Sequence, residues 1–165
     1  ELLKRYERQL LNFFFRQLGD YDGAKDLMMD TFMRIYKAAD RYEPRSKFST
    51  YIYRIARNLC INEFRKREVR KADSLDLMGE ETGMEPAGNE LTPDEFMVRQ
   101  ERQIMVRRAL MELSEDQRTI LILSEYQGLD YEKIAQVMGC SLGTVKSRVF
   151  RARQKIREWM ESHGM

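Results

Sequence analysis

The segment from Asp130 to Arg153, DYEKIAQVMGCSLGTVKSRVFRAR, restricts the possible folds of this chain more than any other stretch. A helix-turn-helix needs a small residue inside its first helix, a turn that suits glycine and an apolar anchor in its second helix. Ala135, Gly139 and Val145 meet these needs at intervals of four and six residues. The pattern predicts a helix over 131–138, a tight turn, and a last helix that ends at about residue 160.

The second helix of this motif presents a polar and basic outer face. Apolar residues fill the space between the two helices, and the residues left facing outward are Thr144, Lys146, Ser147, Phe150 and Arg151, with Arg148 and Arg153 flanking them. Arginine and lysine can read guanine edges or hold phosphate, serine and threonine can do either, and phenylalanine can contact a thymine methyl group. We interpret this face as a reader of duplex DNA; the alternative is a helical hairpin with an ordinary basic surface.

Apolar residues at helical spacing predict three more helices in the first half of the chain, over 2–18, 23–39 and about 46–70. In the third, apolar residues such as Ile52, Ala56 and Leu59 share one face, while basic and amide side chains such as Arg54 and Asn58 lie nearly opposite. No segment alternates as a strand would. The sequence therefore predicts an all-α protein whose first unit is a three-helix bundle with one basic helix face outward.

Charge and composition divide the chain into two small helical domains and a connector. Residues 1–71 carry a net charge of +7, residues 72–103 a net charge of −7 and residues 104–165 a net charge of +2. Segment 72–95 lacks a hydrophobic period and holds three of the nine glycines and two of the three prolines, which predicts a flexible acidic linker between domains at 1–71 and 96–165. The basic units favour a polyanionic partner, although solvated surface charge would give the same pattern.

Composition excludes several classes of protein. The two cysteines, Cys60 and Cys140, lie far apart, and the only histidine is His163, whereas a zinc site needs about four clustered ligands. No run of about 18 apolar residues is present, and the first residues lack the apolar core of a secretory signal. We expect free buried thiols, no metal, no cofactor, no membrane insertion and a cytoplasmic location.

Four stretches resemble one family. GLDYEKIAQVMGCSLGTVKSRVFRARQKIR resembles region four of the extracytoplasmic-function (ECF) sigma factors, the smallest class of the sigma-70 family, and ALMELSEDQRTILILSEYQGLDYEKIA extends the similarity upstream. RYEPRSKFSTYIYRIARNLCINEFRK resembles the part of region two that melts and reads the −10 element, and AKDLMMDTFMRIYKA its polymerase-binding helix. The resemblance implies an alternative sigma factor, which binds core RNA polymerase, directs promoter-specific initiation and is not itself an enzyme.

The resemblance also assigns roles to residues. Docking on the clamp helices of the polymerase beta-prime subunit is implied for Asp26, Met29, Asp30, Phe32 and Arg34, and reading of the −35 element for Thr144, Lys146, Ser147, Arg148, Phe150 and Arg151. Capture and melting of the −10 element are implied for Ala38, Tyr42, Lys47, Phe48, Tyr51, Arg54, Asn58 and Asn62. This agrees with chemistry, because aromatic rings stack on unpaired bases and arginines hold the backbone.

Some expectations concern partners and departures from the family pattern. The family implies contacts with the polymerase beta flap, an acidic linker that passes near the RNA exit path, and control by an anti-sigma factor. Met29 stands where the family usually has glutamine. Tyr51 stands where the family usually has tryptophan, and tyrosine still provides an aromatic ring for stacking. Because the sequence starts close to the first predicted helix, we expect that an upstream helix of the family pattern is missing.

Three other readings remain open at this point. A sigma mimic would sequester an anti-sigma factor without touching DNA, but both DNA-facing sets here hold suitable residues. A DNA-processing enzyme would need a nucleophile or clustered carboxylates, and the acids Asp20, Asp22, Asp26 and Asp30 lie on a turn and an exposed face without a nearby histidine. A regulator that binds duplex DNA alone would not need the basic, amide-bearing helix of the first unit.

Overall fold

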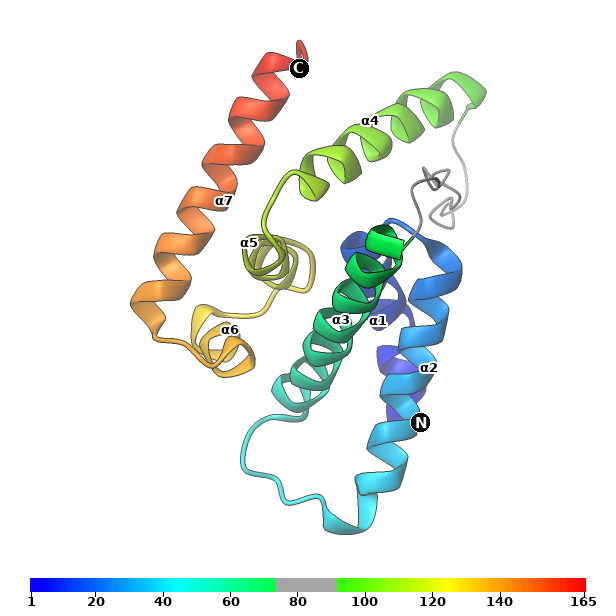
Figure 1. The fold of residues 1–165 in the computed structure, drawn as a ribbon, viewed down its shortest axis with the longest axis vertical. Coiled ribbons are helices and arrows are strands. Elements are labelled where there is room, and N and C mark those ends of the chain that lie inside the picture. Colours follow the sequence, from blue (N-terminus) through cyan, green and yellow to red (C-terminus); the bar gives the residue numbers. More distant parts are fainter. Residues whose placement is uncertain (74–91) are drawn as a thin grey trace.

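The computed structural model describes residues 1–73 and 92–165, and within these ranges every element is helical (Figure 1). The first unit contains α1 (Leu2–Leu18), α2 (Tyr21–Ala38), a short 3-10 turn η1 (Ala39–Arg41) and α3 (Phe48–Asp73). The second contains α4 (Pro93–Met111), α5 (Glu115–Leu121), a π-helical turn η2 (Ile122–Tyr126), α6 (Tyr131–Met138) and α7 (Leu142–Ser162). The predicted all-α fold is confirmed.

The first unit is a three-helix bundle with an aromatic core. Gly19 ends α1 in the left-handed conformation with φ 72°, a region that glycine enters without steric cost, and Asp20 then caps α2 by accepting a hydrogen bond from the Gly23 amide. Phe13 and Phe14 of α1 are fully buried, and Phe13 packs edge-on against Tyr53 of α3, with the ring centroids 5.5 Å apart. This core leaves the opposite face of α3 free to meet other groups.

A side-chain cap starts each α-helix of the second unit. Thr92 with Glu95 and Ser114 with Gln117 form capping boxes. In each box the cap side chain accepts a hydrogen bond from the backbone amide three residues later, and the side chain of that later residue accepts one from the backbone amide of the cap residue. Ser141 caps α7 by accepting a hydrogen bond from the Thr144 amide. Helix α5 ends at Leu121, and the chain then widens into the π turn η2, which apolar periodicity does not signal.

Helices extend into both ends of the range expected to be a linker. Helix α3 continues to Asp73, and α4 begins at Pro93, where proline suits a first helical position and Thr92 supplies the cap. The central part of that range, 74–91, lies outside the described residues.

The two units pack directly against each other, an arrangement that the sequence could not indicate. Helix α6 contacts α3, and α1 contacts both α4 and η2. The buried cores of the two units form one continuous cluster. A buried hydrogen bond from Gln17 Nε2 to Thr119 Oγ1, 2.8 Å long, crosses the boundary. The described residues thus fold as one closed assembly of two units.

Candidate nucleic-acid interface

An aromatic cluster stands at the beginning of α3. The ring centroids of Tyr42 and Tyr51 lie 4.8 Å apart, those of Phe48 and Tyr51 lie 6.0 Å apart, and those of Tyr42 and Phe48 lie 6.2 Å apart. All three side chains are half-buried, so the rings hold one another while keeping part of their surface open. Such rings provide a platform on which an unpaired base can stack.

A basic cavity of about 330 Å³ opens beside this cluster. Its lining contains three residues that were predicted to contact the −10 element, one further apolar residue and three cations: Ala38, Tyr51 and Asn58, then Ile55, then Arg34, Lys37 and Arg41. Lys37 and Arg41 were missed by sequence reasoning, although their four-residue spacing places both on one side of the chain at the end of α2. An aromatic wall, an amide and three cations can hold a base together with its phosphates.

The other residues predicted to read the −10 element lie in three different settings. Lys47 is exposed in the loop before α3. Asn62 lines a neighbouring cavity with Asp30 and Arg34, so Arg34, predicted to bind polymerase, borders both cavities. Arg54 is turned to the second unit, where its Nη2 donates to the backbone carbonyl of Gln136 at 3.2 Å. Thus the predicted −10 residues of α3 do not share one setting: Asn58 and Asn62 border two cavities, while Arg54, although exposed, contacts the second unit.

The outer face of α7 is the second candidate interface. Lys146, Ser147, Phe150 and Arg151 are all exposed, and Phe150 has 69% of its surface open although it is a large apolar residue. Val145 and Val149 are buried beneath them. The predicted division of α7 into a core face and an outward face is confirmed for these residues, whereas Leu142, one of the apolar residues expected between the two helices, is 38% exposed.

Three residues at the edge of this face are engaged inside the protein. Thr144 shares its hydroxyl with the Ser141 cap at 2.8 Å. The Arg148 guanidinium lies 3.6 Å from the Asp116 carboxylate, and Arg153 forms an ion pair with Glu125. The hydrogen bond to Glu125 raises the pKa of Arg153 above its ordinary value. In this arrangement Arg148 and Arg153 brace α7 against α5 and η2.

Helix α2 presents the predicted polymerase-binding residues. Asp26, Met29, Asp30 and Arg34 are exposed, whereas Phe32 is half-buried against the core. Met29 is joined by two exposed apolar residues that sequence reasoning missed, Met33 and Tyr36, the latter 75% exposed. These three residues follow one another at spacings of four and three, so they form an apolar stripe on α2. An exposed apolar stripe of this kind suits a contact with another protein.

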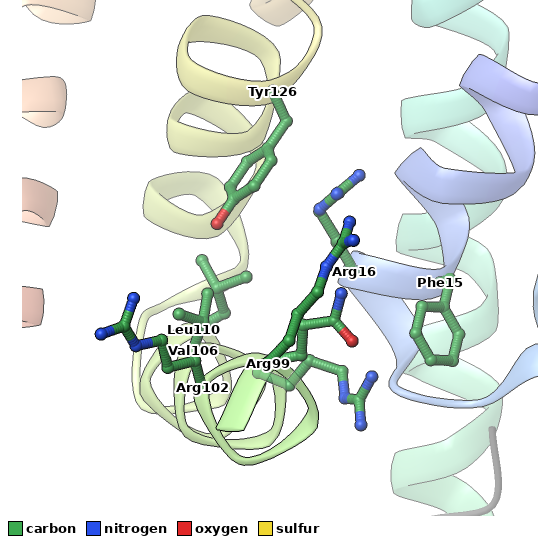
Figure 2. Close-up of a pocket in the computed structure, with 9 residues that line it drawn as sticks. Phe15, Arg16, Arg99, Arg102, Val106, Leu110 and Tyr126 are labelled. Carbon is green, nitrogen blue, oxygen red and sulfur yellow. The ribbon is translucent and has the colours of Figure 1, made fainter. Parts of the chain in front are cut away.

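A third cavity, of about 300 Å³, lies where α1 meets α4 and η2 (Figure 2). Its lining includes Phe15, Arg16, Arg99, Arg102 and Tyr126. The Arg16 guanidinium stacks over the Tyr126 ring, 4.1 Å from its centroid, which joins the two units by a cation–π contact. Sequence reasoning missed this cavity because its walls come from segments about 100 residues apart.

The described part of the chain was also searched for metal-ligand clusters and for membrane-spanning helices. Within residues 1–73 and 92–165, no three histidine, cysteine or carboxylate side chains gather where they could hold a metal ion. None of the helices in these ranges is both long and apolar enough to cross a membrane.

Comparison with known proteins places the two units in one family. Residues 2–70 match the family Sigma-70 region 2, and residues 103–156 match the family Sigma-70, region 4. The chain is 36% identical over 159 residues to the RNA polymerase sigma-H factor of Pseudomonas aeruginosa, covering 94% of this chain and 82% of that protein. It is 32% identical over 159 residues to the ECF RNA polymerase sigma-E factor of Haemophilus influenzae, covering 94% and 83%.

Solved structures extend the similarity across both units. The sigma factor RpoE of Bartonella quintana, solved in complex with the anti-sigma factor NepR, matches with a TM-score of 0.77 and 31% identity over 97% of this chain and 94% of that one. CnrH, solved with the cytosolic domain of CnrY, shares the fold with a TM-score of 0.68 at 20% identity, covering 98% and 86% of the two chains. Since both regions and these relatives agree, the chain belongs to the ECF group of the sigma-70 family of RNA polymerase sigma factors.

Proposed function

We propose that this sigma factor divides promoter reading between its two units, with the −10 element read by residues 1–71 and the −35 element by residues 96–165. The observation that carries the proposal is the presence, in one chain, of a basic aromatic cavity at the α2–α3 corner and an exposed polar and basic face on α7. The first suits unpaired bases, and the second suits the major groove of duplex DNA.

The cavity at the α2–α3 corner would capture a base that has left the duplex. Tyr51 offers its ring for stacking, and Asn58 offers an amide to the base edge. Lys37 and Arg41 lie where they can neutralise the phosphates on either side. Taking a base out of the duplex is opposed by lost stacking, and these contacts supply the compensation.

The outer face of α7 would enter the major groove of the −35 element. Lys146 and Arg151 can bind guanine edges or phosphates, and Phe150 can pack on a thymine methyl group. The buried residues beneath this face belong to the helix-turn-helix core, so these side chains stand on a rigid element.

Binding of core polymerase and of an anti-sigma factor completes the proposed function. The exposed acids and the apolar stripe of α2 would meet the beta-prime clamp helices, and the second unit would meet the beta flap. The protein would act in the cytoplasm and would leave all catalysis to the polymerase. The relative from Bartonella quintana, held by its anti-sigma factor, matches this chain across both units, which supports an anti-sigma partner for this chain as well.

Run-off transcription with purified bacterial core polymerase and a fragmented genomic template tests the proposal. New transcripts should depend on the protein, and their upstream sequences should share two elements. Arg151→Ala should reduce their yield, while Arg157→Ala, which removes an exposed cation further along α7, should not. Absence of any dependent transcript, despite binding to core polymerase, would count against promoter reading.

A further inference from the structure

Four arginines surround the cavity between α1, α4 and η2 (Figure 2). Arg16 belongs to α1, whereas Arg99, Arg102 and Arg107 belong to α4. No aspartate or glutamate of the described ranges lines this cavity, so the formal charges of its lining are all positive. Like charges held close together repel one another, and an anion that entered the cavity would relieve this repulsion. The lining therefore favours an anionic ligand.

The inner wall of the same cavity is apolar and aromatic. Phe15 and Leu110 are buried in this wall, whereas Tyr126 is 42% exposed. A bare inorganic ion would leave this wall uncovered, while a ligand that also carried a ring would bury it, which the hydrophobic effect favours. The cavity thus suits a ligand that combines negative charge with a planar or apolar ring.

The arginines differ in how firmly they are held. The Arg16 guanidinium lies 4.1 Å from the centroid of the Tyr126 ring, and that of Arg107 lies 5.1 Å from the centroid of the Phe15 ring. Both arginines are half-buried, whereas Arg99 and Arg102 are exposed at the rim. Cations that are already oriented lose less freedom when a ligand binds. Guanidinium planes and aromatic rings are also surfaces on which nucleic-acid bases stack.

Size and charge narrow the class of ligand. The cavity volume of about 300 Å³ is at the lower end of the range of small-molecule sites, which suits a single nucleotide. One phosphate group carries about 1.5–2 negative charges, so four guanidinium groups match more than one phosphate.

We propose that this cavity binds a nucleoside polyphosphate, with its phosphates between Arg99 and Arg102 at the rim and its base against Tyr126. Arginine pairs with phosphate through two parallel hydrogen bonds, which gives such a site both affinity and geometry. The inference goes beyond promoter reading, because none of the residues that line this cavity belongs to the proposed −10, −35 or clamp-binding sets.

Isothermal titration of the full chain with ATP, and separately with GTP, tests the proposal at about 150 mM salt, where loose attraction between surface charges is screened. The main variant is Arg99→Gln/Arg102→Gln, and its melting temperature checks that the fold is kept. The matched control is Lys37→Gln/Arg41→Gln, which removes two equally exposed cations from the cavity at the α2–α3 corner.

We expect the wild-type chain and the control to bind at least one of the two nucleotides, and the main variant to bind it about tenfold more weakly or worse, because two charged donors to phosphate are lost. Wild-type protein that bound neither nucleotide would overturn the proposal. Equal weakening in the main variant and the control would also overturn it, since the nucleotide would then not depend on this cavity.

Two further measurements test the cavity and the ligand class separately. Val106→Trp fills the apolar wall and keeps every arginine, so it should also weaken nucleotide binding. Unchanged affinity in this variant would place the nucleotide outside the cavity. Sodium tripolyphosphate should bind more weakly than the nucleotide, because it has no base to cover Tyr126. Tripolyphosphate that bound as tightly as both nucleotides would overturn the assignment of a nucleoside ligand.

The outcome is independent of the proposed promoter reading. Arg99→Gln/Arg102→Gln should leave the binding of a labelled single-stranded DNA of mixed sequence unchanged, whereas Lys37→Gln/Arg41→Gln should weaken it. A failure of nucleotide binding with this DNA pattern intact would remove the nucleotide site alone.

Discussion

Gln17 and Thr119 form a buried hydrogen bond of 2.8 Å although 102 residues separate them in the chain. Thr119 in turn donates to the backbone carbonyl of Glu115 in the preceding turn of α5, so the bond ties α1 to the start of α5. The Gln17 Oε1 atom has no hydrogen-bond partner among the described residues. Within the described residues the Gln17 amide is therefore held through its Nε2 group, for which Thr119 is the acceptor.

Thr119→Val should reduce the free energy of unfolding by about 1–3 kcal/mol, because it keeps the shape of the side chain but leaves the buried Gln17 donor without an acceptor. The double variant Gln17→Leu/Thr119→Val should recover much of that loss, since both polar groups are then gone. Urea unfolding of the four proteins of this cycle measures the coupling. Additive losses in the double variant would show that the two side chains do not depend on each other.

Arg118 should be among the most sensitive positions for stability. Its guanidinium donates to the carbonyls of Leu110, Met111 and Leu113, which lie at the end of α4 and just beyond it, as well as to Gln17. Carbonyls at a helix end lack some of their intrahelical partners, so this one side chain supplies charged donors to several acceptors there. Burial lowers the pKa of Arg118 below its ordinary value, but nearby Glu115 favours the charged form.

Arg118→Met should therefore reduce the free energy of unfolding by about 3 kcal/mol, because hydrogen bonds from a charged donor are worth about 1.5–3 kcal/mol and the cost of burying the guanidinium offsets part of their sum. Arg102→Met, at an exposed position of α4, should change it by less than about 0.5 kcal/mol. Thermal or urea unfolding monitored by circular dichroism distinguishes the two. A loss at Arg118 no larger than that at Arg102 would contradict its proposed role at the end of α4.

Sequence reasoning recovered what depends on short spacing. The three helices of the first unit and the buried face of α7 follow from apolar periodicity, and the Ser114–Gln117 capping box can be read directly from residue types. The helix-turn-helix was found for the same reason, because its small residue, turn and anchor lie within eleven residues.

What escaped prediction depends on contacts between distant segments. Gln17 and Arg118 look like ordinary polar surface positions until the units pack, and nothing local to Arg148 indicates its pairing with Asp116. The cavity around Arg16 and Tyr126 is likewise made by two units together. Family resemblance assigned roles to residues of α2, α3 and α7, but only the tertiary arrangement shows which of these side chains are engaged inside the protein.

Two glycines of the helix-turn-helix should respond oppositely to alanine. Gly139 ends α6 at φ 64°, where a Cβ would be strained even though no other atom lies within 4 Å of its position. Gly143 lies in the first turn of α7 without a positive φ and with open space around it. Gly139→Ala should destabilise by about 1 kcal/mol, whereas Gly143→Ala should be neutral or stabilising by up to about 1 kcal/mol. Melting temperatures check both, and equal shifts would refute the conformational argument.

The two thiols should differ in reactivity. Burial raises the pKa of Cys60 well above its ordinary value, and because the thiolate is the reactive form, Cys60 should resist alkylation in the folded protein near neutral pH. Cys140 is partly exposed and should react. Timed iodoacetamide labelling followed by peptide mass spectrometry should find the label on Cys140 first, and on Cys60 only after addition of denaturant. Equal labelling of both in the native state would contradict the burial of Cys60.

Phe150 should matter for DNA binding and not for stability. Its ring is 69% exposed on α7, so Phe150→Ala should leave the melting temperature within about 2 °C of the wild-type value. If the ring packs on a thymine methyl group, its removal should weaken −35 duplex binding by about 1–3 kcal/mol, and most strongly on sites with a thymine at the contacted step. Met97→Ala provides the control, because Met97 is 60% exposed on α4, outside the proposed interface. Anisotropy titrations with the −35 duplex recovered from run-off transcripts measure the effect, and equal affinities for the two variants would remove Phe150 from the proposed reading face.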